Sequence, residues 1–174
     1  METELQALLH ELETFGRDND AREQERAKKM LNLEPDTAHF ISLLIRTSQR
    51  KQVLEIGTSN GYSTIWLAWA VKTTGGRVTS LERDADKQTL ADANLHRAGL
   101  RNLVDLHLGD ATQLVSTLAG PFDVVFFDAD RIEKFGDRLL ALEKYESMVQ
   151  LLKDEKFRPY VNLAKRQIAK IKAE

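Results

Sequence analysis

Apolar residues along the first 130 positions alternate between two spacings. Short apolar runs that suit buried strands occur at 53–56, 77–82, 103–108 and 122–127. Stretches with apolar residues at helical spacing separate them, at 65–71, 85–98 and 112–118. Strands that alternate with helices at this interval predict a parallel sheet with right-handed crossovers. We therefore expect a doubly wound α/β domain over residues 1–130.

The region before the first strand predicts helices. Residues 3–15 carry apolar positions at helical spacing, and Pro35 suits the first position of another helix. N-terminal helices are therefore expected within residues 1–47. The charged stretch at 17–29 is typical of a solvated helix face or an exposed loop.

The region after Asp130 differs from everything before it. No further apolar strand-like run appears, and an apolar stripe at helical spacing runs from Leu139 to Leu152. The sheet is therefore expected to stop after its fourth strand. Residues 131–174 are expected to form a helical segment that packs on the same domain.

A glycine turn joins the first predicted strand to the helix that follows it. Its spacing is Gly57-x-x-x-Gly61, and Ser59 stands where a dinucleotide-binding loop would place its second glycine. A strand, a glycine turn and a helix bring a nucleotide-like ligand against bare backbone and a helix N-terminus. An ordinary β-turn-α connection remains the alternative interpretation.

Acidic residues stand at the ends of the predicted strands, where ligands of such sheets bind. Glu82 follows Gly57 by 25 positions, the usual reach of an acid that binds a ribose diol. Asp110, beside the small Ala111, suits an amine-bearing base, and Glu55 suits an amino or sulfonium group. No Lys or Arg occurs between 53 and 71 to bind phosphate. These residues indicate a nucleoside ligand without phosphates.

Composition narrows the class of protein further. A net charge of -2 gives no global field for nucleic acid, and Cys 0 excludes disulfides and thiolate metal sites. No apolar run approaches the roughly 18 residues of a membrane span. We expect a cytoplasmic protein with no membrane partner and no nucleic-acid partner.

Four ordered motifs carry a resemblance to a known family. They are VLEIGTSNGYST at 53–64, TSLERD at 79–84, LGDA at 108–111 and FDVVFFDADR at 122–131. They resemble the motifs of the small-molecule O-methyltransferases, the S-adenosylmethionine-dependent family that includes catechol and caffeoyl-CoA methyltransferases. The resemblance covers about residues 30–131, and the last 44 residues do not share it. It implies a Rossmann-like class I methyltransferase fold.

The resemblance also implies roles for individual residues. Gly57, Ser59, Gly61 and Ser63 would line the methionine and ribose end of S-adenosylmethionine. Glu82 would bind the ribose hydroxyls, and Asp110 with Ala111 would face the adenine.

The same resemblance implies a catalytic role for Asp128. In metal-dependent members the acid at this position binds a divalent cation such as Mg²⁺, which orients and acidifies the acceptor hydroxyl. Nothing after Arg131 looks like the family's remaining metal ligands. Asp128 and Asp130 therefore carry two interpretations, as metal ligands or as structural or water-facing acids.

Three functional interpretations follow. The first is an O-methyltransferase, or a derivative of one, that acts on a small-molecule hydroxyl. The second is a non-catalytic cofactor-binding or assembly module. The third is an engineered or recombined chimera whose helical C-terminal segment replaces the substrate half. An uncovered edge on the fourth strand would need a cover from the later helices or a second subunit, and a homodimer is the expected state.

Overall fold

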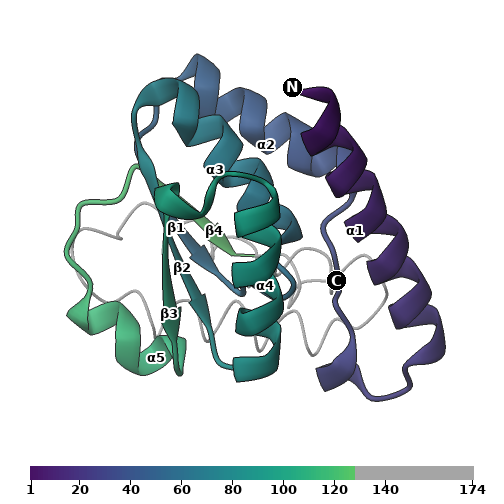
Figure 1. The fold of residues 1–174 in the computed structure, drawn as a ribbon. Helices are drawn as coiled ribbons and strands as arrows, with labels where there is room; N and C mark the ends of the chain where they lie inside the picture. Colours follow the sequence, from purple (N-terminus) through teal and green to yellow (C-terminus); the bar gives the residue numbers. More distant parts are fainter. Residues whose placement is uncertain (128–174) are drawn as a thin grey trace, which may run out of the picture.

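A computed structural model describes residues 1–127, which form one parallel four-stranded sheet with helices on both faces (Figure 1). The strands are β1 (Gln52–Ile56), β2 (Arg77–Glu82), β3 (Val104–Leu108) and β4 (Val124–Phe127). The helices are α1 (Thr3–Arg22), α2 (Pro35–Thr47), α3 (Tyr62–Thr74), α4 (Ala85–Arg97) and α5 (Ala111–Leu114), with single 3-10 turns at Arg26–Lys28, Arg101–Leu103 and Val115–Thr117. The strand order is β3-β2-β1-β4, and every pairing is parallel. The predicted α/β fold is confirmed.

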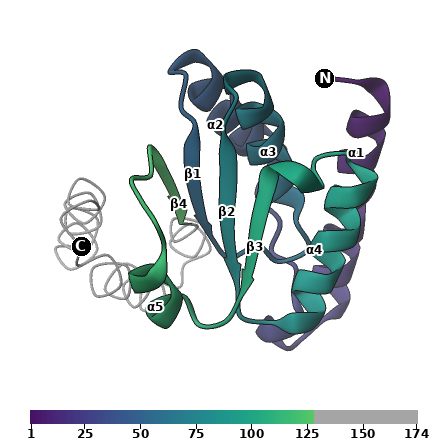
Figure 2. The same ribbon diagram turned by 60° about the vertical axis from the view of Figure 1, so that its left-hand side comes forward.

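The sheet lies between two unequal layers of helices. Helices α2, α3 and α4 lie on one side with α1 outside them, and the short α5 lies on the other (Figures 1 and 2). The core forms between the first layer and the sheet, where Val53, Ile65, Ala68 and Val78 are fully enclosed. Burying each large apolar side chain contributes roughly 1.5–3 kcal/mol, so this layer anchors the strand ends described below.

Local sequence sets where the helices begin and end. Pro35 occupies the first turn of α2, where its missing N–H costs nothing. The Asp84 carboxylate caps α4 by accepting hydrogen bonds from the backbone N–H groups of Asp86 and Lys87. Helix α3 ends at Gly75, which adopts the left-handed conformation that glycine tolerates best.

Two predicted boundaries differ from the structure. The first helix, predicted over 3–15, continues to Arg22, so part of the charged stretch is the solvated helix face and the rest is loop. Long charged side chains favour helix and keep their heads in water, which allows this continuation. The helix predicted over 112–118 is the short α5 followed by a 3-10 turn. No helix within residues 1–127 is long and apolar enough to span a membrane.

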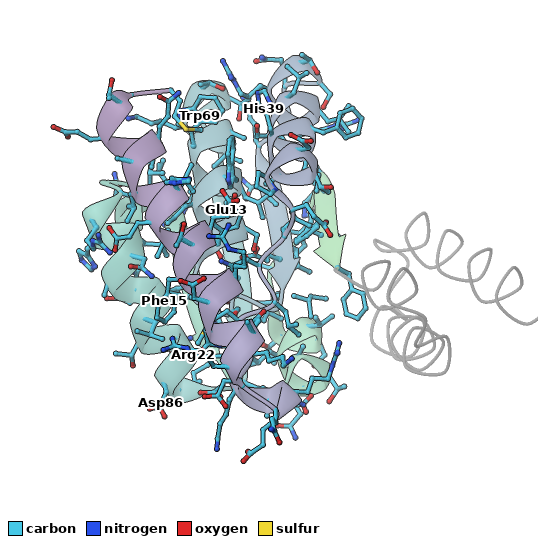
Figure 3. All side chains as sticks on the ribbon, turned by 90° about the vertical axis from the view of Figure 1, so that its right-hand side faces the viewer. Glu13, Phe15, Arg22, His39, Trp69 and Asp86 are labelled. Carbon is cyan, nitrogen blue, oxygen red and sulfur yellow. The ribbon has the colours of Figure 1, made fainter. Side chains whose placement is uncertain are left out.

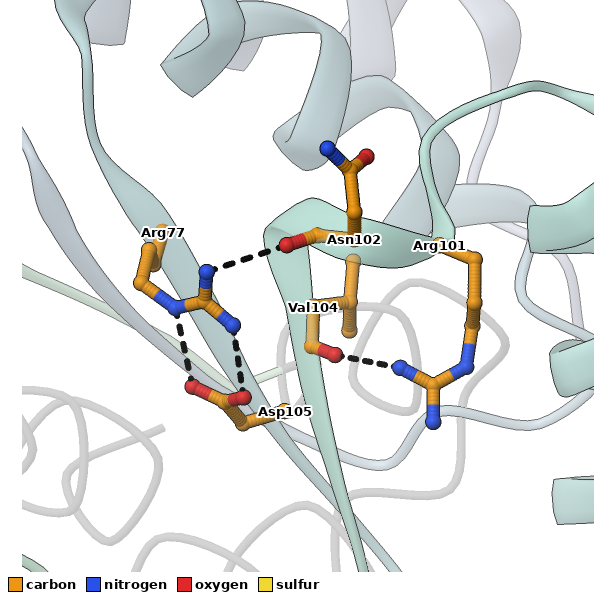
Figure 4. A network of polar contacts seen from close by, with 5 residues as sticks. All are labelled: Arg77, Arg101, Asn102, Val104 and Asp105. Atoms are coloured by element: carbon orange, nitrogen blue, oxygen red, sulfur yellow. Dashed lines mark hydrogen bonds and ion pairs between the residues drawn. The ribbon is translucent and has the colours of Figure 1, made fainter.

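Polar contacts fasten the amino end of the sheet. Arg77 at the start of β2 makes a bidentate ion pair with Asp105 on β3, with N–O distances of 3.1 and 2.7 Å (Figure 4). The Asp123 carboxylate accepts hydrogen bonds from the backbone N–H groups of Lys51 and Gln52, at 2.6 and 3.0 Å. These contacts hold neighbouring strands in register at the end opposite the glycine turn.

An aromatic cluster fastens the N-terminal helices to α3. The rings of Trp66 and Trp69 meet edge to face at 6.0 Å, and His39 of α2 lies 5.8 Å from Trp66. The guanidinium group of Arg46 lies 4.5 Å from the centre of the Trp69 ring. A hollow of about 520 Å³ adjoins this cluster between α1, α2 and α3. Figure 3 looks onto this side of the molecule and labels Glu13, His39 and Trp69, which line the hollow.

Candidate functional site

The glycine turn at 57–61 lies where the carboxyl ends of three strands meet. The backbone N–H of Gly57 donates to Leu81 O at 2.9 Å, and that of Gly109 donates to Glu82 O at 2.8 Å. The ends of β1, β2 and β3 are thereby joined in a row. The structure therefore brings the predicted residues Gly57, Glu82 and Asp110 to one edge of the sheet, where such folds bind their ligands.

The two glycines of the turn have different structural roles. Gly57 has φ +99 and is exposed, and a Cβ added there would meet nothing within 4 Å. Gly61 has φ +86, and a Cβ there would lie 3.1 Å from the Cα of Ala91 on α4. The first glycine leaves backbone open on the ligand side, and the second lets α3 and α4 approach closely. Between them Ser59 also adopts a positive φ, +51.

Glu82 at the end of β2 is bound by three backbone N–H groups. Its Oε2 accepts from Ser59 at 2.7 Å, and its Oε1 accepts from Arg83 and Asp84, both at 2.9 Å. The side chain is only 8% exposed. Two carboxylate oxygens provide about four acceptor positions, so three amides leave capacity for a ligand hydroxyl. The acid predicted to bind a ribose is thus fixed by one amide of the glycine turn and by the two amides that follow β2.

Glu55 lies under the turn and not on its open side. It is 0% exposed, and its carboxylate accepts hydrogen bonds at 2.6 Å from the hydroxyl groups of Ser63, Thr64 and Ser80. Burial raises the pKa of Glu55 to about 7, against the lowering effect of the three hydroxyl donors. The nearby Glu82 raises this pKa further. Because of this enclosure, Glu55 contacts the hydroxyl groups beneath the turn and does not reach its exposed face.

The two serines predicted to line the ligand have partners within the protein. The hydroxyl of Ser63 donates to Glu55, and that of Ser59 donates to the backbone oxygen of Met30 at 2.7 Å. The backbone oxygen of Lys29 accepts from the ammonium group of Lys87 on α4 at 2.7 Å. The segment at 29–30 therefore lies against the turn, a contact that no sequence pattern had indicated.

Asp110 and Ala111 lie at the end of β3 and the start of α5. The exposed Asp110 carboxylate caps α5 by accepting from the backbone N–H of Thr112 at 2.7 Å and from its hydroxyl. The hydrogen bonds from Thr112 lower the pKa of Asp110, so it is an anion at neutral pH. This places a negative charge at the predicted adenine side of the site.

The predicted metal ligands Asp128 and Asp130 lie outside the described residues. Within residues 1–127, no three His, Cys, Asp or Glu side chains gather closely enough to hold a metal ion. The Mg²⁺ prediction therefore stays a prediction.

The residues at this edge fit a phosphate-free adenosine cofactor. Open backbone at Gly57, an acceptor at Glu82 and an anion at Asp110 suit hydroxyl and amine groups. No Lys or Arg lies between 53 and 71 to pair with ligand phosphates. The fold and this site define an α/β protein of the kind found in S-adenosylmethionine-dependent methyltransferases.

The family assignment rests on a match that covers most of the chain. The O-methyltransferase family model matches residues 3–157, so the chain belongs to this family. The match is longer than the motifs had predicted, because it begins in α1 and continues past Arg131.

Individual relatives agree with the assignment. A catechol O-methyltransferase from Niastella koreensis is 40% identical over 111 residues, which are 62% of this chain and 50% of that protein. An O-methyltransferase from Bacillus cereus, solved in complex with S-adenosylhomocysteine, matches with a TM-score of 0.57 and 30% identity, covering 82% of this chain and 61% of that one. TomG from Streptomyces achromogenes, solved with S-adenosylmethionine, matches with a TM-score of 0.58 and 30% identity, covering 82% and 60%. The chain spans about half the length of the curated relatives it matches.

Proposed function

We propose that this chain binds S-adenosylmethionine at the carboxyl edge of its sheet and transfers the methyl group to a small-molecule hydroxyl. The observation that carries the proposal is the enclosed Glu82 carboxylate, held by three backbone N–H groups beside an open glycine turn that has no cation between 53 and 71. When bound, S-adenosylmethionine would supply a methyl group from its positively charged sulfur. Once the methyl group is transferred, that sulfur becomes a neutral thioether.

The chain's own residues bind and orient this cofactor. Gly57, Ser59, Gly61 and Ser63 hold its methionine and ribose end, Glu82 accepts from the ribose hydroxyls, and Asp110 with Ala111 faces the adenine. Backbone donors already fix the Glu82 carboxylate, so little rotamer freedom remains to be lost on binding. Holding the methyl group and the acceptor hydroxyl in the reacting geometry accounts for much of the rate acceleration of such a transfer.

The acceptor and the assembly belong to the same proposal. The named relatives include catechol O-methyltransferases, and catechol-type hydroxyls are the acceptors to test first. A homodimer is proposed as the assembly to test, because an open sheet edge would favour pairing with a second copy. Light scattering after size exclusion tests this state, and a monomer would exclude it.

The experiment separates binding from turnover. S-adenosylmethionine and S-adenosylhomocysteine are titrated by calorimetry, and methyl transfer to catechol-type acceptors is assayed with and without Mg²⁺. Turnover stimulated by Mg²⁺ and abolished by Asp128→Ala supports the metal-dependent enzyme.

Binding without turnover supports the second candidate, a cofactor-binding module. Failure of both ligands to bind at millimolar concentration would overturn both candidates.

A further inference from the structure

Four hydroxyl-bearing residues connect the buried Glu55 to strand β2, to helix α3 and to the turn between β1 and α3. Ser80 faces it from β2, its register partner, and Ser63 and Thr64 face it from the first turn of α3. The hydroxyl of Thr58, within the turn, lies 2.5 Å from that of Ser80. Glu55 is therefore the point at which β1, β2, α3 and the turn are joined.

The direction of the hydrogens in this network follows from counting donors. A hydroxyl group has one hydrogen, and that of Ser80 is donated to Glu55. The hydrogen in the contact between Thr58 and Ser80 must therefore come from Thr58. The chain of bonds runs from Thr58 to Ser80 to Oε2 of Glu55, and ionised Glu55 accepts all three of its hydroxyl partners without any of them turning.

Protonation of Glu55 conflicts with this arrangement. A neutral carboxyl group brings a hydrogen of its own, and one of its three hydroxyl partners must then turn to accept it. Hydrogen bonds to a charged acceptor are also roughly twice as strong as those to a neutral one. Loss of the charge thus weakens the hold on Thr58 and on the first turn of α3.

The surroundings of Glu55 place this titration near neutral pH. Its enclosure raises its pKa, and Glu82 at the end of β2 raises it further. Helix α3 and strand β2 present hydroxyl groups to it, and its register partner on β4 is Phe126. No cation within residues 1–127 acts on it strongly enough to offset the burial.

We propose that ionised Glu55 is a positioning residue for the cofactor turn, which it holds through the hydroxyl chain from Ser80 to Thr58, so that cofactor affinity falls when Glu55 is protonated. This inference rests on the proposed cofactor function. Glu55 does not touch the cofactor, and its effect passes through Thr58 and the start of α3.

The binding test compares four forms of the whole protein by calorimetry with S-adenosylhomocysteine between about pH 6 and pH 8. In the wild type, affinity rises about tenfold or more with pH, since proton and ligand binding are coupled.

Glu55→Gln mimics the protonated acid, so its affinity is low and independent of pH. Thr58→Val keeps the shape of the side chain but cuts the hydroxyl chain, and it weakens both affinity and pH dependence. Glu4→Gln, an exposed acid on α1, is the matched control and follows the wild type. A Glu55→Gln profile equal to that of the wild type would overturn the proposal.

A second readout needs no ligand. In labelled protein, the carboxyl carbon of Glu55 and the backbone amides of Ser59 and Gly61 are followed by NMR as pH changes. We expect the chemical shifts of all three signals to change over the same pH range. In Glu55→Gln, the chemical shifts of the two amides should not change with pH. Amides that ignore the titration of Glu55 would overturn the inference. Joint titration in a protein that binds no S-adenosylhomocysteine would instead overturn the proposed function and support the positioning of the turn.

Discussion

The two ends of the sheet use acidic residues in opposite ways. At the amino end, Asp105 pairs with Arg77 while both side chains stay about half exposed, at 49% and 48%. Hydrogen bonds from Arg77 lower the pKa of Asp105. At the carboxyl end, Glu55 and Glu82 are enclosed and have only hydroxyl and amide partners. Arg77 fixes Asp105 with charge in water, whereas Glu55 and Glu82 are fixed by neutral donors away from water.

This difference separates stability from function. A solvent-exposed ion pair adds little to the free energy of unfolding. The pair at the amino end therefore holds the strands in register but contributes little to stability. A buried acid without a cation is costly to ionise, and a chain keeps one only where the structure requires it. The acids whose ionisation is unfavourable therefore lie at the carboxyl end. We expect their burial to serve the cofactor site and not the stability of the fold.

The largest effect is expected at Gly61. Gly61→Val places a β-branched side chain at φ +86 and against the backbone of Ala91, 3.1 Å from its added Cβ. Strain and overpacking together should lower the free energy of unfolding by about 3–5 kcal/mol. Urea denaturation measures it. The control is Gly75→Val, which has φ +69 but open space, and about 1–2 kcal/mol is expected there. Equal losses would show that α3 and α4 do not need this close approach.

The next effect is a dependence of stability on pH. Burial raises the pKa of Glu55 from its ordinary 4.5 to about 7, so the folded protein holds this proton more tightly than the unfolded chain. Stability from this group is therefore full below about pH 4.5 and is lost as pH rises to 7. Between about pH 5 and pH 8 the loss is about 2–3 kcal/mol.

Glu55→Gln checks the sign of this dependence. We expect the difference in unfolding free energy between the two pH values to shrink in the variant by that amount. Stability and cofactor affinity should then change in opposite directions with pH in the wild type. A wild type that gains stability from this group on going to higher pH would contradict the assignment.

A smaller effect concerns cofactor affinity at Glu82. Glu82→Ala removes the acceptor proposed for the ribose and leaves the N–H of Ser59 without its partner. Affinity for S-adenosylhomocysteine should fall by roughly 1–3 kcal/mol, measured by calorimetry. Asp105→Ala, at the amino end, is the control and should leave affinity unchanged. An unchanged affinity in Glu82→Ala would remove Glu82 from the site.

The smallest effect is expected at Arg77. Arg77→Met keeps the length of the side chain and removes its ion pair with Asp105. We expect a loss of about 0.2–1 kcal/mol in unfolding free energy, which high salt reduces further. A loss as large as that at Gly61 would mean that the two ends of the sheet do not differ as described.

Much of the site could be predicted from the chain alone. Because parallel strands end at one edge, Glu82 and Asp110 were expected beside Gly57, and the structure brings them there. The contact of Met30 with Ser59 was not predictable, since it joins residues 29 positions apart without a motif. The roles of Thr58 and Ser80 were missed for the same reason, although polar residues beside a buried acid were a signal that could have indicated them.

The sequence by itself determined the order of strands and helices, the two glycines of the turn and the family of the protein, because these depend on local spacing and on ordered motifs. Only the tertiary structure decided which way each acid faces. Glu55 and Glu82 lie near the carboxyl ends of neighbouring strands, yet one is enclosed by hydroxyl groups and the other is bound by backbone amides of Ser59, Arg83 and Asp84. The direction of a side chain at a strand end depends on the helix and strand packed against it, and that packing forms only when distant parts of the chain meet.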